Sequence, residues 1–203
     1  MDQRLNRSLI RVADFYDRRK VGDSGPLGFR RSTDLTTLLA CLDRLTGERI
    51  IVPGETAFLD LGCADGRVNL FFSYLVKLSV GIELDEWTFE EYGPLRCQIE
   101  DSLEEEGLLP PPENTFLFHG DSTDEKIHDD IVCKTGLTIE GFDLFYTYLV
   151  MHDEFAEMLA EKARAGAIFM VYGLHKIMPR YPGFRLLQHL SPMEGILALY
   201  QKM

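Results

Sequence analysis

The 203-residue sequence predicts an α/β fold with a mostly parallel, seven-stranded β-sheet, and two patterns support this prediction. From residue 57 onward, short apolar runs alternate with amphipathic segments in the order β-α-β-α-β-α-β-α-β. This alternation is typical of a parallel sheet with helices on both faces. Two further apolar runs at the C-terminus are joined by only a few residues, "SPME". So short a link indicates an antiparallel hairpin at the sheet edge.

The first 49 residues lack this alternation, and we expect them to form a helical cap on a core of residues 50–203. Residues 3–17 place four apolar side chains at helical spacing, which predicts an amphipathic helix. Docking onto the protein's own core explains this helix better than membrane binding, because the helix is short and its charges are mixed. The four apolar residues are Leu5, Leu9, Val12 and Tyr16.

A second helix is expected to begin after Ser32 or Thr33 as N-cap and to end near Gly47. Five leucines between residues 35 and 45 form its apolar stripe. The loop before it, residues 21–31, contains three glycines and a proline. Two interpretations stay open for this loop: a lid that folds over a bound ligand, or a flexible linker.

The remaining elements follow from periodicity and from turn residues. One helix is expected to begin near Pro94, a favourable first helical residue. The expected strands are 57–61, 79–84, 115–119, 142–148, 167–172 and two in the C-terminal tail, and the other expected helices are 67–76, 124–133 and 153–164.

Composition limits the function classes. The net charge is −12, which disfavours non-specific binding to nucleic-acid phosphates. The four cysteines are scattered without C-x-x-C spacing and the histidines do not cluster near them, so no metal site is expected. Reduced thiols are typical of a cytoplasmic protein. No apolar run is long enough to span a membrane, and the N-terminus does not look like a signal peptide.

Polar residues follow three successive strands of the predicted sheet. In a doubly wound sheet, ligands bind beyond the carboxyl ends of the strands, where the strand order reverses. The residues expected there are Asp60, Gly62, Cys63, Ala64, Asp65 and Gly66 after the first strand, Glu83 and Leu84 after the second, and Asp121 and Ser122 after the third.

The first turn lacks the G-x-G-x-x-G pattern that lets a backbone approach a pyrophosphate. Its glycines are Gly62 and Gly66, and the carboxylates of Asp60 and Asp65 would repel a pyrophosphate. These carboxylates suit a ligand with a cationic centre or an ammonium group. S-adenosylmethionine has both, which makes it the expected ligand. A nicotinamide dinucleotide fits this turn poorly.

The other strand ends can hold the rest of such a ligand. A carboxylate at Glu83 can accept hydrogen bonds from both ribose hydroxyls. Asp121 can accept one from an adenine amine, with Ser122 beside it, and Leu84 and Trp87 can pack on the adenine faces. Each acid alone could be an ordinary polar loop residue. Their joint occurrence at three successive strand ends is what indicates a binding site.

The segments "FLDLGCADGR", "VGIELD" and "FHGDSTD" resemble motifs I, post-I and II of class I S-adenosylmethionine-dependent methyltransferases. The tail "FRLLQHLSPMEGILALYQKM" resembles the hairpin that closes the Rossmann-like sheet of that family. The resemblance covers about residues 55–203. It implies that Gly62 and its turn approach the methionine part of the cofactor, that Glu83 holds the ribose, and that Asp121 holds the adenine. Ala64 departs from the family pattern, in which glycine is usual.

A narrower resemblance concerns "DLGCADGRVNL", "GIELDEW" and "FDLFYTYLVMHDEFAEML". They are similar to small protein-lysine methyltransferases, including mitochondrial enzymes that modify the ATP-synthase c-subunit and, more distantly, histone-lysine methyltransferases of the class I fold. The acceptor stays open between a protein lysine and a small molecule. The alternative to an enzyme is a non-catalytic module that kept the cofactor-binding fold.

The end of the fourth strand is where acceptors usually lie in this family. Tyr146 and His152 are the candidate catalytic residues there. A tyrosine can hold a cationic amine by its face or accept a hydrogen bond from it, and a histidine can act as a base. Sheet-end packing and a surface histidine are the plain alternatives. Asp153 is expected to be the N-cap of the following helix.

Overall fold

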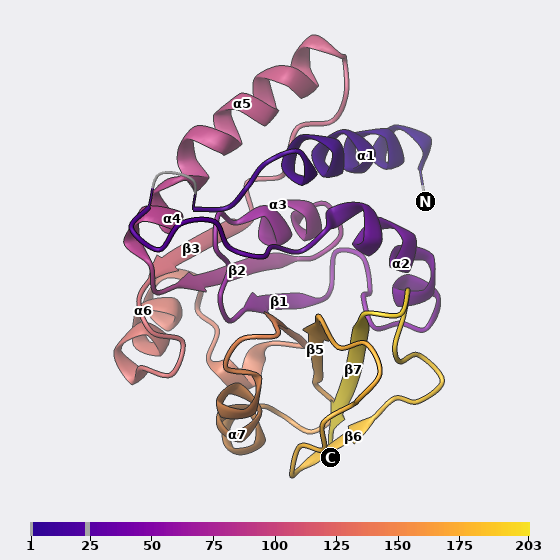
Figure 1. Cartoon of the computed structure of the whole chain (residues 1–203), viewed down its shortest axis with the longest axis vertical. Coiled ribbons are helices and arrows are strands. Elements are labelled where there is room, and N and C mark those ends of the chain that lie inside the picture. Colours follow the sequence, from indigo (N-terminus) through magenta and orange to yellow (C-terminus); the bar gives the residue numbers. More distant parts are fainter. Residues whose placement is uncertain (1, 23–24) are drawn as a thin grey trace.

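The computed structural model describes residues 2–22 and 25–203 and contains one seven-stranded sheet with helices on both faces (Figure 1). The strands are β1 (Ala57–Asp60), β2 (Leu78–Glu83), β3 (Thr115–His119), β4 (Leu144–Tyr148), β5 (Ile168–Tyr172), β6 (Phe184–Leu186) and β7 (Leu197–Lys202). The helices are α1 (Gln3–Asp17), α2 (Leu35–Gly47), α3 (Arg67–Ser73), α4 (Glu86–Glu90), α5 (Tyr92–Glu105), α6 (Glu125–Thr135) and α7 (His152–Lys162), with a 3₁₀ turn at Ile139–Gly141.

The strand order is β3-β2-β1-β4-β5-β7-β6. Strands β1 to β5 pair in parallel, while β7 is antiparallel to both β5 and β6. The predicted Rossmann-like sheet with an antiparallel C-terminal hairpin is confirmed. The order reverses between β1 and β4, where Asp60 pairs in register with Tyr146. This reversal point is where an open α/β sheet binds its ligand.

Two apolar layers cover the sheet, because successive strand residues point to opposite faces. One layer joins α1, α2, α3 and α5 to sheet residues that include Phe58, Leu144 and Tyr146. The other joins α6 and α7 to residues that include Leu59 and Phe145. Figure 1 shows α1, α3 and α5 on the upper side of the sheet and α6 and α7 on the lower side.

The two N-terminal helices pack on the sheet through the predicted stripes. In α1, Leu9, Val12 and Tyr16 are buried, and in α2 all of Leu35, Leu38, Leu42 and Leu45 are buried. The predicted N-cap of α2 was wrong. Neither Ser32 nor Thr33 caps the helix; the side chain of Asp34 accepts a hydrogen bond from the Thr37 N–H at 2.6 Å, which is the usual N-cap bond.

Most element boundaries differ from the predictions by one or two residues, and some differ more. Helix α4 was not predicted, and α5 begins before Pro94. Helix α3 ends at Ser73. In the tail, only three residues of "FRLLQHL" pair as a strand, so the connection to β7 is longer than expected. Asp153 lies in the first turn of α7, and Met151, with φ +52°, stands at the N-cap. Its left-handed backbone is uncommon for a residue with a side chain.

Among the described residues, no helix is both long and apolar enough to cross a membrane.

Candidate functional site

A cavity of about 800 Å³ opens at the carboxyl ends of the central strands. The wall comes from the ends of β1, β2, β3, β4 and β5 and from the segment between α1 and α2. Nine predicted site residues line it: Asp60, Gly62, Cys63, Ala64, Glu83, Leu84, Asp121, Ser122 and Tyr146. Three do not, namely Asp65, Gly66 and His152.

The turn after β1 is tied to the end of β2. The Ala64 N–H donates to Glu83 Oε2 at 2.8 Å, and the Cys63 N–H donates to the Ile82 carbonyl at 2.8 Å. Ala64 has φ +50°, a left-handed conformation that costs an L-residue about 1–2 kcal/mol. This explains why glycine is usual at this position. Gly62 has φ +153°, and a Cβ added there would meet no atom within 4 Å. The backbone at Gly62 therefore faces the open cavity.

Asp60 is the last residue of β1, and its carboxylate is buried at the end of the strand. Its side chain is 1% exposed, and Oδ1 is buried without a hydrogen-bond partner among the described residues. Burial, with the carboxylates of Glu83 and Asp65 nearby, raises the pKa of Asp60 well above its usual range. Buried polar atoms are nearly always paired in native proteins, so the unpaired Oδ1 calls for a donor from a ligand.

Asp65 does not face the cavity, contrary to the prediction. Its carboxylate makes a two-pronged pair with Arg67, in which Nε–Oδ1 and Nη2–Oδ2 are both 2.9 Å. Both side chains are buried, and the Arg67 guanidinium lies 5.5 Å from the centre of the Tyr16 ring. Asp65 is therefore a packing element beneath the turn. Gly66, with φ +73°, begins α3 against the ring of Tyr92, where a Cβ would come within 2.4 Å.

The end of β3 supplies Asp121 and Ser122. Asp121 Oδ1 accepts hydrogen bonds from the Thr123 N–H and hydroxyl, both at 2.8 Å. Because a carboxylate can accept at two oxygens, Oδ2 remains for a ligand. The Ser122 carbonyl lies 2.8 Å from His128 Nε2, which fixes this loop. Leu84 lines the cavity near these residues as predicted, whereas Trp87 does not and instead lies against Gly25.

The contact between Arg30 and the acids at the end of β2 was not predicted from the sequence. We call residues 18–33 the strap; its described part is 18–22 and 25–33. Arg30 Nη1 lies 3.6 Å from Glu83 Oε1, and Nη2 lies 2.9 Å from Asp85 Oδ2. The second contact is an ion pair whose angles do not suit a hydrogen bond. The partners are more than 50 residues apart, so no local pattern reveals them.

The strap is anchored at both ends and forms one wall of the cavity. The Arg30 N–H donates to the Val21 carbonyl at 3.1 Å. At its base, the Asp17 carboxylate accepts from the Leu35 and Thr36 N–H groups at 2.8 and 2.9 Å. A compact loop with close ends fits this description better than a flexible linker.

The two candidate catalytic residues have different surroundings. The Tyr146 hydroxyl is hydrogen-bonded to the Thr33 hydroxyl of the strap. Burial, together with Asp60, raises the pKa of Tyr146 well above its usual range. His152 is the first residue of α7 and does not line the cavity; its Nδ1 lies 2.8 Å from the Tyr181 hydroxyl. The histidine that lines the cavity is His175, after β5.

Within the described ranges there is no group of three or more His, Cys, Asp and Glu side chains arranged to hold a metal ion.

The sequence matches no protein-family model and no curated protein. Solved structures are similar in fold. An RNA methyltransferase from Salinibacter ruber in complex with S-adenosyl-L-homocysteine has a TM-score of 0.53 at 16% identity, covering 85% of this chain and 93% of that chain. The rRNA methyltransferase aviRa from Streptomyces viridochromogenes has a TM-score of 0.57 at 12% identity, covering 88% of both chains.

The tRNA methyltransferase TrmI from Aquifex aeolicus has a TM-score of 0.56 at 12% identity, covering 96% of this chain and 76% of that chain. The fold of this chain is therefore the class I S-adenosylmethionine-dependent methyltransferase fold. At these identities the likeness concerns the fold, and the argument for an activity has to come from the site.

Proposed function

We propose that this protein is an S-adenosylmethionine-dependent methyltransferase. The observation that carries the proposal is the Asp60 carboxylate at the reversal point of the sheet, whose buried Oδ1 has no hydrogen-bond partner in the part of the chain that the structure describes. An ammonium group is the donor that such an atom needs, and the amino group of the cofactor supplies one. The neighbouring structure from Salinibacter ruber, which holds S-adenosyl-L-homocysteine, is consistent with this ligand class.

The other residues of the cavity fit the remaining parts of the cofactor. Gly62 presents backbone where a Cβ would project into open space, which leaves room for the methionine part. Glu83 keeps acceptor sites for ribose hydroxyls beyond the two backbone N–H groups that it already accepts. Asp121 and Ser122 would hold the adenine, and Leu84 would pack against it.

The cofactor would supply an electrophilic methyl group, and the protein's task is to align the acceptor and exclude water. The acceptor would enter between the strap and the ends of β4 and β5. Tyr146 cannot act as a base there, because its raised pKa keeps the phenol protonated. We assign it a positioning role: its bond to Thr33 holds the strap against the reaction end of the cavity.

His175 replaces His152 as the candidate base. Its Nδ1 lies 3.1 Å from the Gly195 carbonyl, which can only accept. Nδ1 therefore carries the proton and leaves Nε2 as an acceptor, the form that a base requires. An amine acceptor must be neutral to react, so a base at this place would assist. The acceptor that we favour is a protein lysine amine or a small molecule.

The test is transfer of a labelled methyl group from S-adenosylmethionine into a cell lysate that is then separated into protein, RNA, lipid and small-molecule fractions. We expect label in one fraction with the wild-type protein and none with Asp60→Asn. His175→Ala should lower kcat at neutral pH and shift the pH profile, while His152→Ala should not. Cofactor binding without transfer to any fraction would contradict the enzymatic proposal and leave a binding module.

A further inference from the structure

Exposed apolar side chains gather around the cavity opening. Among the described residues, eleven large apolar side chains are exposed, and eight of them lie on four segments at the carboxyl end of the sheet. These segments are the strap, residues 84–87, residues 149–151 and residues 174–183; together we call them the mouth face. The eight residues are Leu27, Phe29, Leu84, Trp87, Leu149, Val150, Met151 and Ile177.

Several of these side chains lie outside any cofactor site. Ile177 is 84% exposed and Phe29 is 59% exposed, and neither lines the cavity. Trp87 is 55% exposed and does not line the cavity either, whereas Leu27, 69% exposed, lies on the cavity wall. Scattered single apolar residues need no explanation, but a cluster on one face indicates an interaction surface.

The same face carries a local excess of positive charge. Its described residues include seven of the 21 Lys and Arg residues of the chain but, of the 33 Asp and Glu residues, only Asp85 and Glu86, although the whole chain has a net charge of −12. Of these two acids, Asp85 pairs with Arg30. Lys20, Arg31, Lys176 and Arg180 form no ion pair with any described residue.

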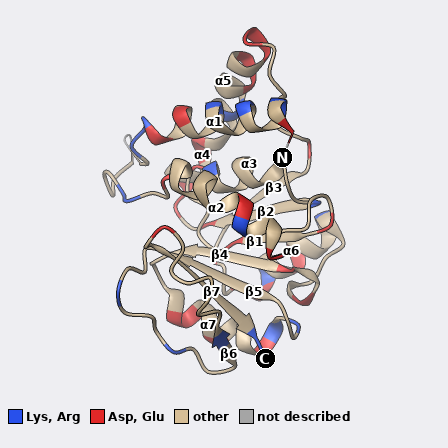
Figure 2. Ribbon diagram, turned by 90° about the vertical axis from the view of Figure 1, so that its right-hand side faces the viewer, with Lys and Arg blue, Asp and Glu red and all other residues tan. Residues whose placement is uncertain are grey.

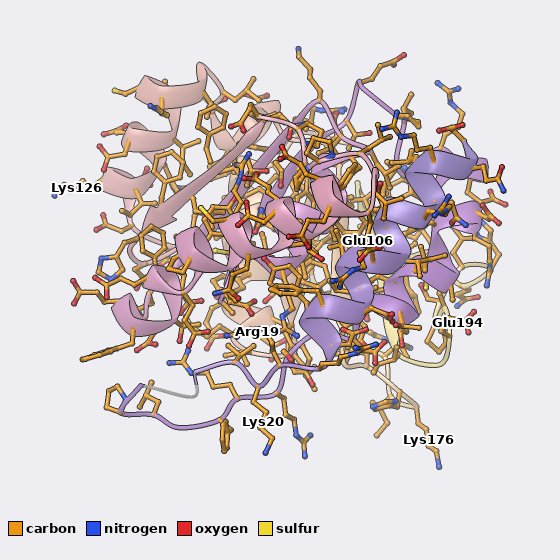
Figure 3. All side chains as sticks on the ribbon, turned by 90° about the horizontal axis from the view of Figure 1, so that it is seen from above. Arg19, Lys20, Glu106, Lys126, Lys176 and Glu194 are labelled. Atoms are coloured by element: carbon orange, nitrogen blue, oxygen red, sulfur yellow. The ribbon has the colours of Figure 1, made fainter. Side chains whose placement is uncertain are left out.

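The figures place the cationic segments on one side of the molecule. In Figure 2 the strap and the loop between β5 and β6, both marked with blue, extend to the left of the view. In Figure 3, Lys20 and Lys176 both project from the lower edge, whereas Lys126 of α6 lies at the left edge, further up. The cavity is lined by both segments, through Leu27 and Arg31 of the strap and His175 of the loop.

We propose that the mouth face docks on the surface of a membrane that contains anionic lipid, so that the cavity opens toward the bilayer and the acceptor is presented there. Unpaired cations would contact the headgroups, each with about 1 kcal/mol of attraction. Leu27, Phe29, Val150 and Ile177 would enter the interface between headgroups and acyl chains.

The chemistry of the face favours a bilayer over other anionic partners. An RNA surface would make use of the cations and of stacking aromatic rings, but most of the exposed apolar residues here are aliphatic. A soluble partner with a lysine-rich surface would be repelled by the positive charge, so a lysine acceptor would have to be presented at the bilayer, without a basic surface around it. An anionic bilayer satisfies both features, because charge and apolar insertion act together in peripheral binding.

The experiment is flotation of the full-length protein with vesicles of phosphatidylcholine alone or mixed equally with phosphatidylglycerol. We expect binding to the mixed vesicles only, weakened by salt. Lys20→Glu with Lys176→Glu should lower the binding at least about tenfold, and Phe29→Ser with Ile177→Ser should lower it to a similar extent. Arg7→Glu with Lys126→Glu, two exposed cations outside the mouth face, is the matched control and should bind as the wild type does.

The proposal is overturned if the protein does not float with the mixed vesicles, if the control pair weakens binding as much as the mouth-face pair, or if the protein binds RNA in place of vesicles. Binding of S-adenosylhomocysteine, measured on the same samples by calorimetry, should be unchanged in all three double variants. Loss of cofactor binding in the wild type would count against the proposed function and not against the docking surface.

Discussion

Asp60 is an ionisable residue, and one of its carboxylate oxygens has no partner among residues 2–22 and 25–203. Because burial raises its pKa, the folded state binds the proton more tightly than the unfolded chain does. The stabilisation from this group is therefore complete below the unfolded pKa and is lost as the pH rises through the folded pKa. At neutral pH the buried Asp60 side chain therefore costs stability in the ligand-free protein, as groups of binding sites often do.

Replacing Asp60 by Asn should therefore change the stability of the protein and its affinity for the cofactor in opposite directions. We expect the free energy of unfolding of the ligand-free protein to rise at neutral pH, by about 1–3 kcal/mol, since the buried charge is removed. Affinity for S-adenosylhomocysteine should be lost. Urea unfolding across the pH range and calorimetry measure the two effects. An unfolding free energy lower than that of the wild type at neutral pH would show that an unidentified partner satisfies Asp60.

A substitution at Gly62 tests whether the cofactor occupies the open space beside the turn after β1. In Gly62→Ala the added methyl group would project into the cavity, so we expect the affinity for S-adenosylhomocysteine to fall at least about a hundredfold, measured by calorimetry. The backbone strain should cost about 1 kcal/mol.

Gly54→Ala is the matched control, because Gly54 has φ +74° and open space around it but does not line the cavity. It should lose similar stability and keep its affinity. If Gly62→Ala and Gly54→Ala bind S-adenosylhomocysteine with equal affinity, the cofactor does not lie beside the Gly62 turn.

At the scale of elements, the strap contacts the end of β2 through Arg30, which also lines the cavity. The guanidinium lies between Glu83 and Asp85, and a ribose held by Glu83 would lie directly beside it. Cofactor and strap should therefore stabilise each other, since each binds better when the other is in place.

Limited trypsin digestion can measure this coupling. S-adenosylhomocysteine should slow cleavage after Lys20 and Arg31 in the wild type, because the strap opens less often when the site is occupied. In Arg30→Gln the protection should disappear and the affinity should fall about tenfold. Arg18→Gln, at a strap arginine with a largely exposed side chain, should behave as the wild type. Full protection in Arg30→Gln would show that the strap responds to the cofactor by another route.

The strand ends were predictable from the sequence, whereas contacts between distant segments were not. Asp60, Glu83 and Asp121 line the cavity because the carboxyl ends of parallel strands meet at one edge, a consequence of topology alone. Asp65 lies off the cavity wall because its carboxylate is buried with Arg67 under α1. His152 also lies off the wall, and its imidazole contacts the hydroxyl of Tyr181, 29 positions away.

Predictions of helix and strand boundaries were wrong where tertiary contacts override local sequence signals. Pro94 is a good first helical residue, yet α5 begins before it and follows a short helix, α4, that carries Trp87 against the strap. The tail contains two apolar runs, but only three residues of the first one reach a pairing partner. Apolar periodicity predicts which face of an element is buried, not how many of its residues find a partner.

On the scale of the whole molecule, segments far apart in the sequence together form the walls of one cavity. The central strands supply the acids, and the strap supplies a cation, a wall and a hydroxyl for Tyr146. The loop after β5 adds His175. A chain with a net charge of −12 thus presents a positive, apolar face around an acidic cavity, which suits a cationic cofactor inside and an anionic surface outside.

The most direct test of the central claim is calorimetric titration of the wild-type protein with S-adenosylhomocysteine, beside the double variant Asp60→Asn with Glu83→Gln. We predict one site per chain with micromolar-range affinity in the wild type and no measurable binding in the variant, whose circular dichroism should be unchanged. Absence of binding at millimolar ligand in the wild type, or thermal stabilisation by NAD but not by S-adenosylhomocysteine, would contradict the account.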